Sequence, residues 1–116
     1  MGLEVQKGFF KSRGDVLADI ERNGYWPWTF VSGPSPGLDV HWHSHDVHGY
    51  VMEGRTSFLD VESGKRLAVE PGDKVIVPAR ALHAEGEVVD RVVYILAAPE
   101  PMGSDEFLQL LPPEDL

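Results

Sequence analysis

Short apolar runs separated by turn residues fill most of the chain between residues 38 and 98. Such runs, rich in β-branched and aromatic side chains and bounded by glycine, proline and aspartate, are typical of β-strands. We expect strands near residues 38–43, 48–53, 55–61, 66–69, 74–77, 82–87 and 91–97. No helical pattern interrupts them, so the sequence predicts an all-β sandwich or barrel.

The N-terminal part of the chain has a different pattern. Val16, Leu17 and Ile20 follow a helical spacing within residues 12–22, and an Asn-Gly pair follows as a stop signal. We therefore expect a short amphipathic helix there. The aromatic and β-branched segment 25–31 predicts a further strand, at a sheet edge or at a strand entry because its proline has no amide proton for a central strand.

The C-terminal part ends the β pattern with two prolines near residue 100. Residues 105–111 predict one or two helical turns before an acidic tail. Trp26 and Trp28 precede the β region, and large aromatic side chains outside a small core often cover a barrel or a dimer surface.

Four of the five histidines, His41, His43, His45 and His48, lie in one stretch. On an extended strand the first three project from one face, because side chains alternate with a period of two. The strand pattern breaks after His45, so we place His45 near the site or at the surface. Neutral imidazole is the commonest protein ligand of transition metals, and a metal site needs at least three protein ligands. The spacing therefore predicts a metal site formed by His41, His43 and the distant His83.

Composition narrows the classes of function. A chain of 116 residues forms one domain with one core. Its net charge of -9 argues against nucleic-acid and anionic-membrane binding. The chain has no cysteine, hence no disulfide or thiolate site. No apolar run has the length of a signal peptide or a membrane span, so we expect a cytoplasmic protein.

The histidine stretches resemble the two motifs of the cupin superfamily, G-x5-H-x-H-x3-4-E-x6-G and G-x5-P-x-G-x2-H-x3-N. The matching residues are His41, His43, Gly54, Gly72, Pro78 and His83. The resemblance covers residues 37–97. It implies that residues 1–116 form a single cupin domain, a jelly-roll β-barrel with a short N-terminal helix and a short helical C-terminal tail. It also implies a homodimer.

The glutamate of the first motif has no clear equivalent. Counting back from Gly54 places Val47 at its position, whereas counting forward from His43 with the longer gap places His48 there. A regular strand would turn His48 outward and leave a three-histidine site. A bulge at Asp46 would reverse the parity and make His48 a fourth ligand. The sequence fits both alternatives, and we include His48 among the expected ligands.

Other motif positions also differ. The first motif begins with glycine where this chain has Ser35. The second motif has an inner glycine where this chain has Arg80, and a final asparagine where it has Glu87. We expect Arg80 to be solvated, with a substrate carboxylate as its alternative partner. Trp42 and Tyr50 alternate away from the ligand face and are expected to pack.

The absence of the motif glutamate indicates the type of chemistry. Imidazoles alone leave the metal's charge uncompensated, which favours an anionic substrate group and nitrogen-preferring metals over Mg²⁺ or Ca²⁺. With the resemblance, the expected cofactor is a divalent transition metal (Fe, Mn, Ni, Zn or Cu). The resemblance implies a dioxygenase-like, metal-dependent enzyme acting on a small anionic molecule. The alternatives are a non-catalytic binding or sensing barrel, and an isomerase or epimerase with Glu85 as the base.

Overall fold

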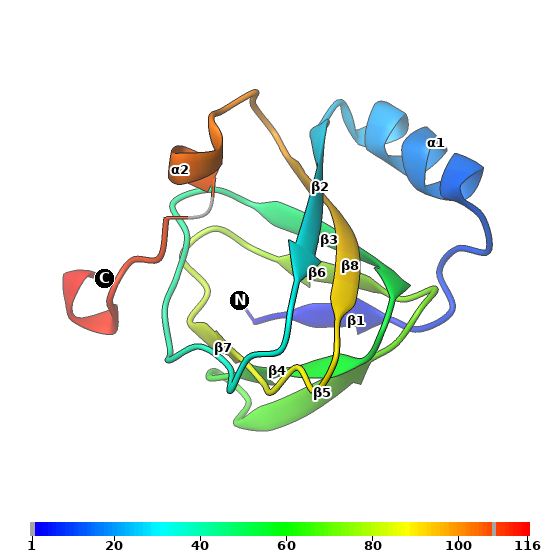
Figure 1. Ribbon diagram of the computed structural model, residues 1–116. Helices are drawn as coiled ribbons and strands as arrows, with labels where there is room; N and C mark the ends of the chain where they lie inside the picture. The colour runs from blue at the N-terminus through cyan, green and yellow to red at the C-terminus, as the bar shows by residue number, and fades with distance from the viewer. Residues whose placement is uncertain (1, 108) are drawn as a thin grey trace.

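The computed structural model describes residues 2–107 and 109–116, and they form two antiparallel sheets with few helices (Figure 1). The elements in chain order are β1 (Glu4–Gln6), α1 (Arg13–Asn23), β2 (Trp26–Ser32), β3 (Val47–Glu53), β4 (Thr56–Asp60), β5 (Lys65–Val69), β6 (Lys74–Val77), β7 (His83–Glu85), β8 (Val92–Ala98), α2 (Ser104–Phe107) and a 3₁₀ turn (Pro113–Asp115). The larger sheet has the order β1-β6-β3-β8-β2, and the smaller has the order β5-β4-β7.

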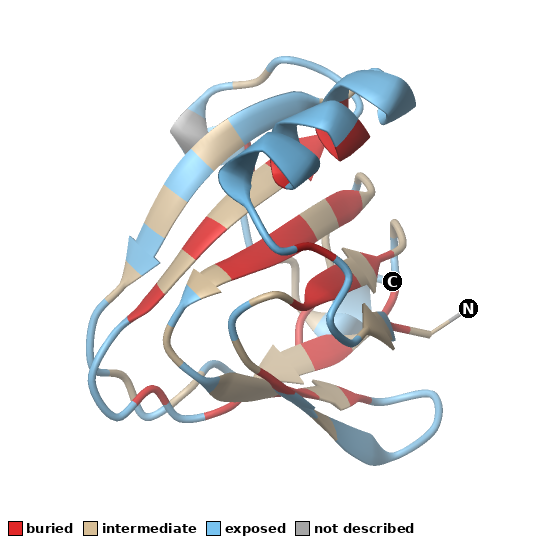
Figure 2. Cartoon of the chain, turned by 90° about the vertical axis from the view of Figure 1, so that its right-hand side faces the viewer, coloured by how far each residue is buried: buried red, intermediate tan, exposed pale blue. Residues whose placement is uncertain are grey.

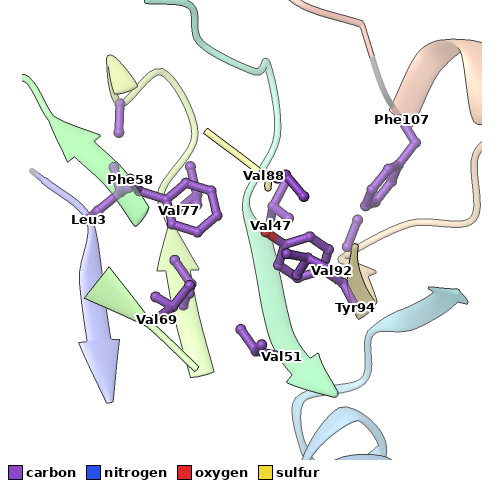
Figure 3. Packing of buried hydrophobic residues seen from close by; sticks show 13 residues of the cluster. Leu3, Val47, Val51, Phe58, Val69, Val77, Val88, Val92, Tyr94 and Phe107 are labelled. Carbon is purple, nitrogen blue, oxygen red and sulfur yellow. The ribbon is translucent and has the colours of Figure 1, made fainter. Parts of the chain in front are cut away.

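The main hydrophobic core lies between the two sheets, where the larger sheet contributes Val47, Val51 and Val77 and the smaller contributes Phe58 and Val69 (Figure 3). The cross-strand pairs Val47–Val77 and Gly49–Val75 bring residues of β3 and β6 onto this inner face. Apolar side chains at every second position of both strands therefore hold the sheets together.

The two sheets are not closed into the single barrel that the sequence predicts. The segment expected as a strand at 38–43 forms isolated bridges in place of a regular strand, through His41–His83 and Trp42–Leu111. The segment therefore runs beside β7 without joining the two sheets into one.

Several strands differ in length from the sequence expectation. The strand expected at 82–87 is shorter, because β7 covers only His83–Glu85. The segment Glu4–Gln6 forms a strand that the pattern did not indicate, through pairing with β6. β2 is an edge strand that pairs with β8 alone, which explains how it accommodates Pro27.

Helix α1 packs on the outer face of the larger sheet (Figure 2). Its N-terminus is closed by a capping box between Ser12 and Asp15. Val16 and Ile20 are buried, but Leu17 is 49% exposed, so the expected stripe of three apolar residues is reduced to two. Asp19 completes the buried face, because it lies one turn from Val16.

Asp19 is the centre of a buried polar cluster between α1 and the sheet. Its Oδ2 accepts hydrogen bonds from the Tyr50 hydroxyl and the Lys74 ammonium, each at 2.6 Å. Its Oδ1 accepts one from Arg22 at 2.9 Å. Burial alone would raise the pKa of Asp19, but bonds from Lys74, Tyr50 and Arg22 outweigh it and hold the pKa below its usual value. The cluster therefore attaches α1 to β3 and β6 through a carboxylate that stays ionised.

The C-terminal segment crosses the end of the inter-sheet space. Phe107, the last residue of α2, is buried against the Trp28 ring at a centroid distance of 4.3 Å. The helical turns expected at 105–111 are limited to the four residues Ser104–Phe107, and Leu108 lies outside the described residues. In the part of the chain that the structure describes, no helix has the length and apolar character needed to cross a membrane.

Candidate metal centre

Three histidines from two distant segments converge at one end of the inter-sheet space. One ring nitrogen each of His41, His43 and His83 lies within 4.8 Å of the others. A pair of backbone hydrogen bonds sets the distance between the segments, since the amide of His41 donates to the carbonyl of His83 at 2.8 Å and the reverse bond is 3.0 Å. His41 and His83 are buried, and His43 is half-buried.

The second ring nitrogen of each histidine is held by a backbone carbonyl. The Nδ1–O distances are 2.7 Å from His41 to Asp39, 3.1 Å from His43 to Gln109, and 2.9 Å from His83 to Ala81. A carbonyl oxygen only accepts, so each Nδ1 carries the proton and each Nε2 keeps its lone pair. Metal-ligating histidines characteristically have such an acceptor on the other ring nitrogen. The backbone carbonyls thus fix the orientation of all three rings and leave each Nε2 facing the site.

Burial favours the neutral form of two of these rings. Burial, together with the neighbouring His83 and His41, lowers the pKa of His43 to about 4. Burial also lowers the pKa of His83. The pKa of His41 is raised instead, because Glu85 and the Asp39 carbonyl outweigh the effect of burial. Neutral imidazole is the form that binds metals.

Glu85 adds a carboxylate beside the three histidines. Its Oε2 lies 3.1 Å from His41 Nε2, yet the pair lacks the geometry of a hydrogen bond, and both atoms are buried without a hydrogen-bond partner. Burial raises the pKa of Glu85, but the neighbouring histidines, His41 foremost, outweigh it and lower the pKa. From the sequence we expected Glu85 only as a base. The signal for its position was the spacing His83-x-Glu85, which places both side chains on one face of a strand.

A cavity of about 180 Å³ adjoins the histidines between the two sheets. Its lining is mainly apolar and comprises Phe30, Leu38, Val47, Gly49, Phe58, Val75, Val77, Leu96, Phe107 and Leu110, with His43, His83, Glu85 and Tyr94 as the ionisable members. Burial and the nearby Glu85 raise the pKa of Tyr94 well above its usual value, so its phenol stays protonated. The cavity therefore presents apolar walls with a polar end.

The structure places His48 on the opposite face of the sheet from these three histidines. β3 pairs with β6 in regular register from Val47 to Tyr50, and its one irregularity lies between Val51 and Glu53. Val47 faces the cavity and His48 does not, which is the parity of a strand without a bulge at Asp46. His48 stacks on Tyr25 with a centroid distance of 4.5 Å, and Val47 lines the cavity.

The remaining candidates lie around the site. His45 lies 5.9 Å from His43 between ring centroids, and the group of three histidines does not include it. Arg80 has a φ of 70°, the left-handed conformation for which the motif uses glycine. Its amide donates to the carbonyl of His43 at 2.8 Å. Trp42 packs near the Arg80 guanidinium, and its indole donates to the Pro112 carbonyl at 2.9 Å.

No family model matches the sequence, and no curated protein matches it. Solved structures do match. A DUF861 family protein from Thermotoga maritima has a TM-score of 0.55 and 19% identity over 81% of this chain and 96% of that one. A cupin-2 domain containing protein from Shewanella frigidimarina has a TM-score of 0.55 and 17% identity over 69% and 72%. The DMSP lyase DddQ from Ruegeria pomeroyi has a TM-score of 0.58 and 16% identity over 71% and 41%.

Identities at this level establish the fold and no more. The comparison agrees with the architecture described above, which has two antiparallel sheets and a core between them. The three histidines lie at one end of that core. We conclude that this chain has the cupin fold, with three histidines placed closely enough to bind a metal.

Proposed function

We propose that this protein is a metal-dependent enzyme that holds one divalent transition metal through His41, His43 and His83. The observation that carries this proposal is the hydrogen bonding of the three rings. Each Nδ1 is bonded to a backbone carbonyl, which leaves each Nε2 to bind a metal. Imidazole nitrogens suit iron, nickel, zinc and copper. Manganese stays among the candidates through the resemblance to cupins.

The cavity supports a small substrate with an apolar body and one anionic group. Its volume of about 180 Å³ lies below the range of about 300–1,000 Å³ typical of ligand pockets, so the substrate is small. The protonated phenol of Tyr94 would donate a hydrogen bond to that substrate. A bound metal supplies a Lewis acid with open positions for the anionic group. The apolar walls would surround the apolar body of the substrate and keep water away from it.

Dioxygen incorporation is the reaction class that we propose. Among the described residues that line the cavity, the ionisable ones are His43, His83, Glu85 and Tyr94. This leaves few groups for acid–base chemistry, since two of them are proposed metal ligands. A dioxygenase places both atoms of O₂ in its product and needs no external reductant.

Two measurements test this proposal in sequence. Elemental analysis of protein purified without added metal should give one transition metal per chain. If the protein binds no metal even after metal is added, the proposed metal centre is wrong. Oxygen uptake by the Fe²⁺-loaded protein should then appear with one class among thiol, diketone and carboxylate substrates. No uptake across the panel with fully loaded protein would favour a non-catalytic binding protein.

A further inference from the structure

We propose that Glu85 is the carboxylate ligand of this metal centre and occupies a fourth position beside the three histidines. This inference rests on the proposed metal site and deepens it. It replaces the expectation of a site made only of imidazoles. The carboxylate would come from β7, the strand that carries His83, and the β3 strand of the first motif would contribute none.

The positions of the strands explain why β3 offers no carboxylate. Val47 occupies the place that counting back from Gly54 assigns to the glutamate, and it lines the cavity as an apolar side chain. His48 faces Tyr25 on the other side of the sheet. β7 in contrast directs two polar side chains to the cavity, since His83 and Glu85 are two residues apart and both line it.

The contact between Glu85 and His41 has the form expected of two ligands of one ion. His41 uses Nδ1 as the donor to Asp39, so its neutral ring presents a lone pair at Nε2. A carboxylate oxygen 3.1 Å away also presents lone pairs, and neither buried atom has a hydrogen-bond partner. Two facing acceptors need a positive charge between them, which a proton or a metal ion can supply.

The distance fits a shared metal. Metal–nitrogen and metal–oxygen bonds of about 2.0–2.2 Å, separated by angles between octahedral and tetrahedral values, place the two ligand atoms about 2.8–3.6 Å apart. The separation of 3.1 Å between His41 Nε2 and Glu85 Oε2 lies within that range. Glu85 would also offset part of the divalent charge that three imidazoles leave.

A proton shared by His41 and Glu85 is the competing explanation, and the two explanations predict opposite effects. If Glu85 is a ligand, Glu85→Gln should weaken metal binding by tenfold or more. If Glu85 only stabilises a proton on His41, that proton competes with the metal. The same substitution would then leave the affinity unchanged or increase it.

The experiment measures the affinity of the full chain for Zn²⁺ by competition with a chromophoric chelator, and the absorption spectrum of the Co²⁺ form. Glu85→Gln should lower the affinity at least tenfold and shift the cobalt bands, and formate should restore the bands by filling the open position. Glu87→Gln, which removes an exposed carboxylate two residues away, should change neither. Thermal unfolding of each metal-free variant establishes that it is folded.

The outcomes separate this inference from the proposed function. If the wild-type chain binds no metal, the metal centre itself is wrong. If the wild type binds one metal per chain and Glu85→Gln binds it equally well with unchanged cobalt bands, the three-histidine site stands and Glu85 is not a ligand.

Discussion

The Nδ1 of His43 donates to the backbone carbonyl of Gln109, so a proposed metal ligand is oriented by the C-terminal segment of the chain. The contact joins residues 66 positions apart in the sequence. The neighbouring backbone bonds between Trp42 and Leu111 bring the two segments together. The tail therefore belongs to the support of the site as well as to the cover of the core.

Trp42→Phe should loosen this support. The substitution removes the indole bond to the Pro112 carbonyl, a loss of about 1 kcal/mol. We expect faster amide hydrogen exchange at Leu111 and metal affinity reduced a few-fold, because His43 loses part of its orientation. Trp26→Phe on the exposed edge strand is the matched control and should change neither quantity. Unchanged exchange at Leu111 in Trp42→Phe would contradict this role of the tail.

The three histidines and His48 should respond differently to substitution. We expect His83→Ala to abolish stoichiometric metal while the sheets stay folded, because the core between them is hydrophobic. His48→Ala should leave the metal affinity within error, because His48 lies on the other face of the sheet. Metal analysis with circular dichroism measures both. A tenfold loss of affinity in His48→Ala would return His48 to the list of ligands.

Gly54 is required by a close approach of two backbones. A Cβ at this position would lie 2.0 Å from the Arg91 carbonyl oxygen, and its φ is 84°. Gly64 has a φ of 73° with open space around it. We expect Gly64→Ala to lower the free energy of unfolding by about 1–2 kcal/mol through the backbone term alone. Gly54→Ala should cost at least about 2 kcal/mol more, because the overlap adds to that term. Urea unfolding of both variants measures the difference, and equal losses would contradict it.

The buried Asp19 should make stability depend on acid pH. Its folded pKa lies below the usual value, so its contribution is complete above a pH of about 4, where the unfolded carboxyl ionises. That contribution is lost as the pH falls through the lower folded pKa. Asp19→Asn leaves the Lys74 ammonium buried without its partner, which should cost about 3–5 kcal/mol at neutral pH.

The difference in unfolding free energy between wild type and Asp19→Asn should therefore be constant near neutral pH and shrink below a pH of about 4. Urea unfolding across this range measures it. The exposed Asp90→Asn variant is the control and should follow the wild type at every pH. A difference that grows towards acid pH would mean that the assigned direction of the Asp19 pKa is wrong.

The proximity of His41, His43 and His83 was predictable, because it depends on strand periodicity and on the spacing of two motifs. The side of the sheet on which His48 lies was not. It depends on whether a one-residue irregularity lies before the segment of β3 that pairs with β6 or after it. No turn signal in the sequence distinguishes these two positions. The irregularity lies after Val51.

Other features depend on contacts between distant segments. β1 is too short to show periodicity and exists through its pairing with β6. The Glu85–His41 contact requires the path of residues 38–43, which the sequence predicts as a regular strand and the structure shows as isolated bridges. Leu17 fits the apolar stripe of α1 by spacing, yet the polar Asp19 is buried because Lys74 and Tyr50 are opposite it.

Side chains alternate along β3, so one face of the strand packs between the two sheets and the other packs under α1. Val47, Gly49 and Val51 belong to the space between the sheets, while Tyr50 reaches the carboxylate of Asp19 under α1. Deleting one residue within this strand would exchange the two sets, filling the cavity with a phenol and separating α1 from its anchor. The packing on both faces of the sheet therefore constrains the length of β3. An insertion or deletion of one residue in β3 would disrupt the site and the docking of α1 together.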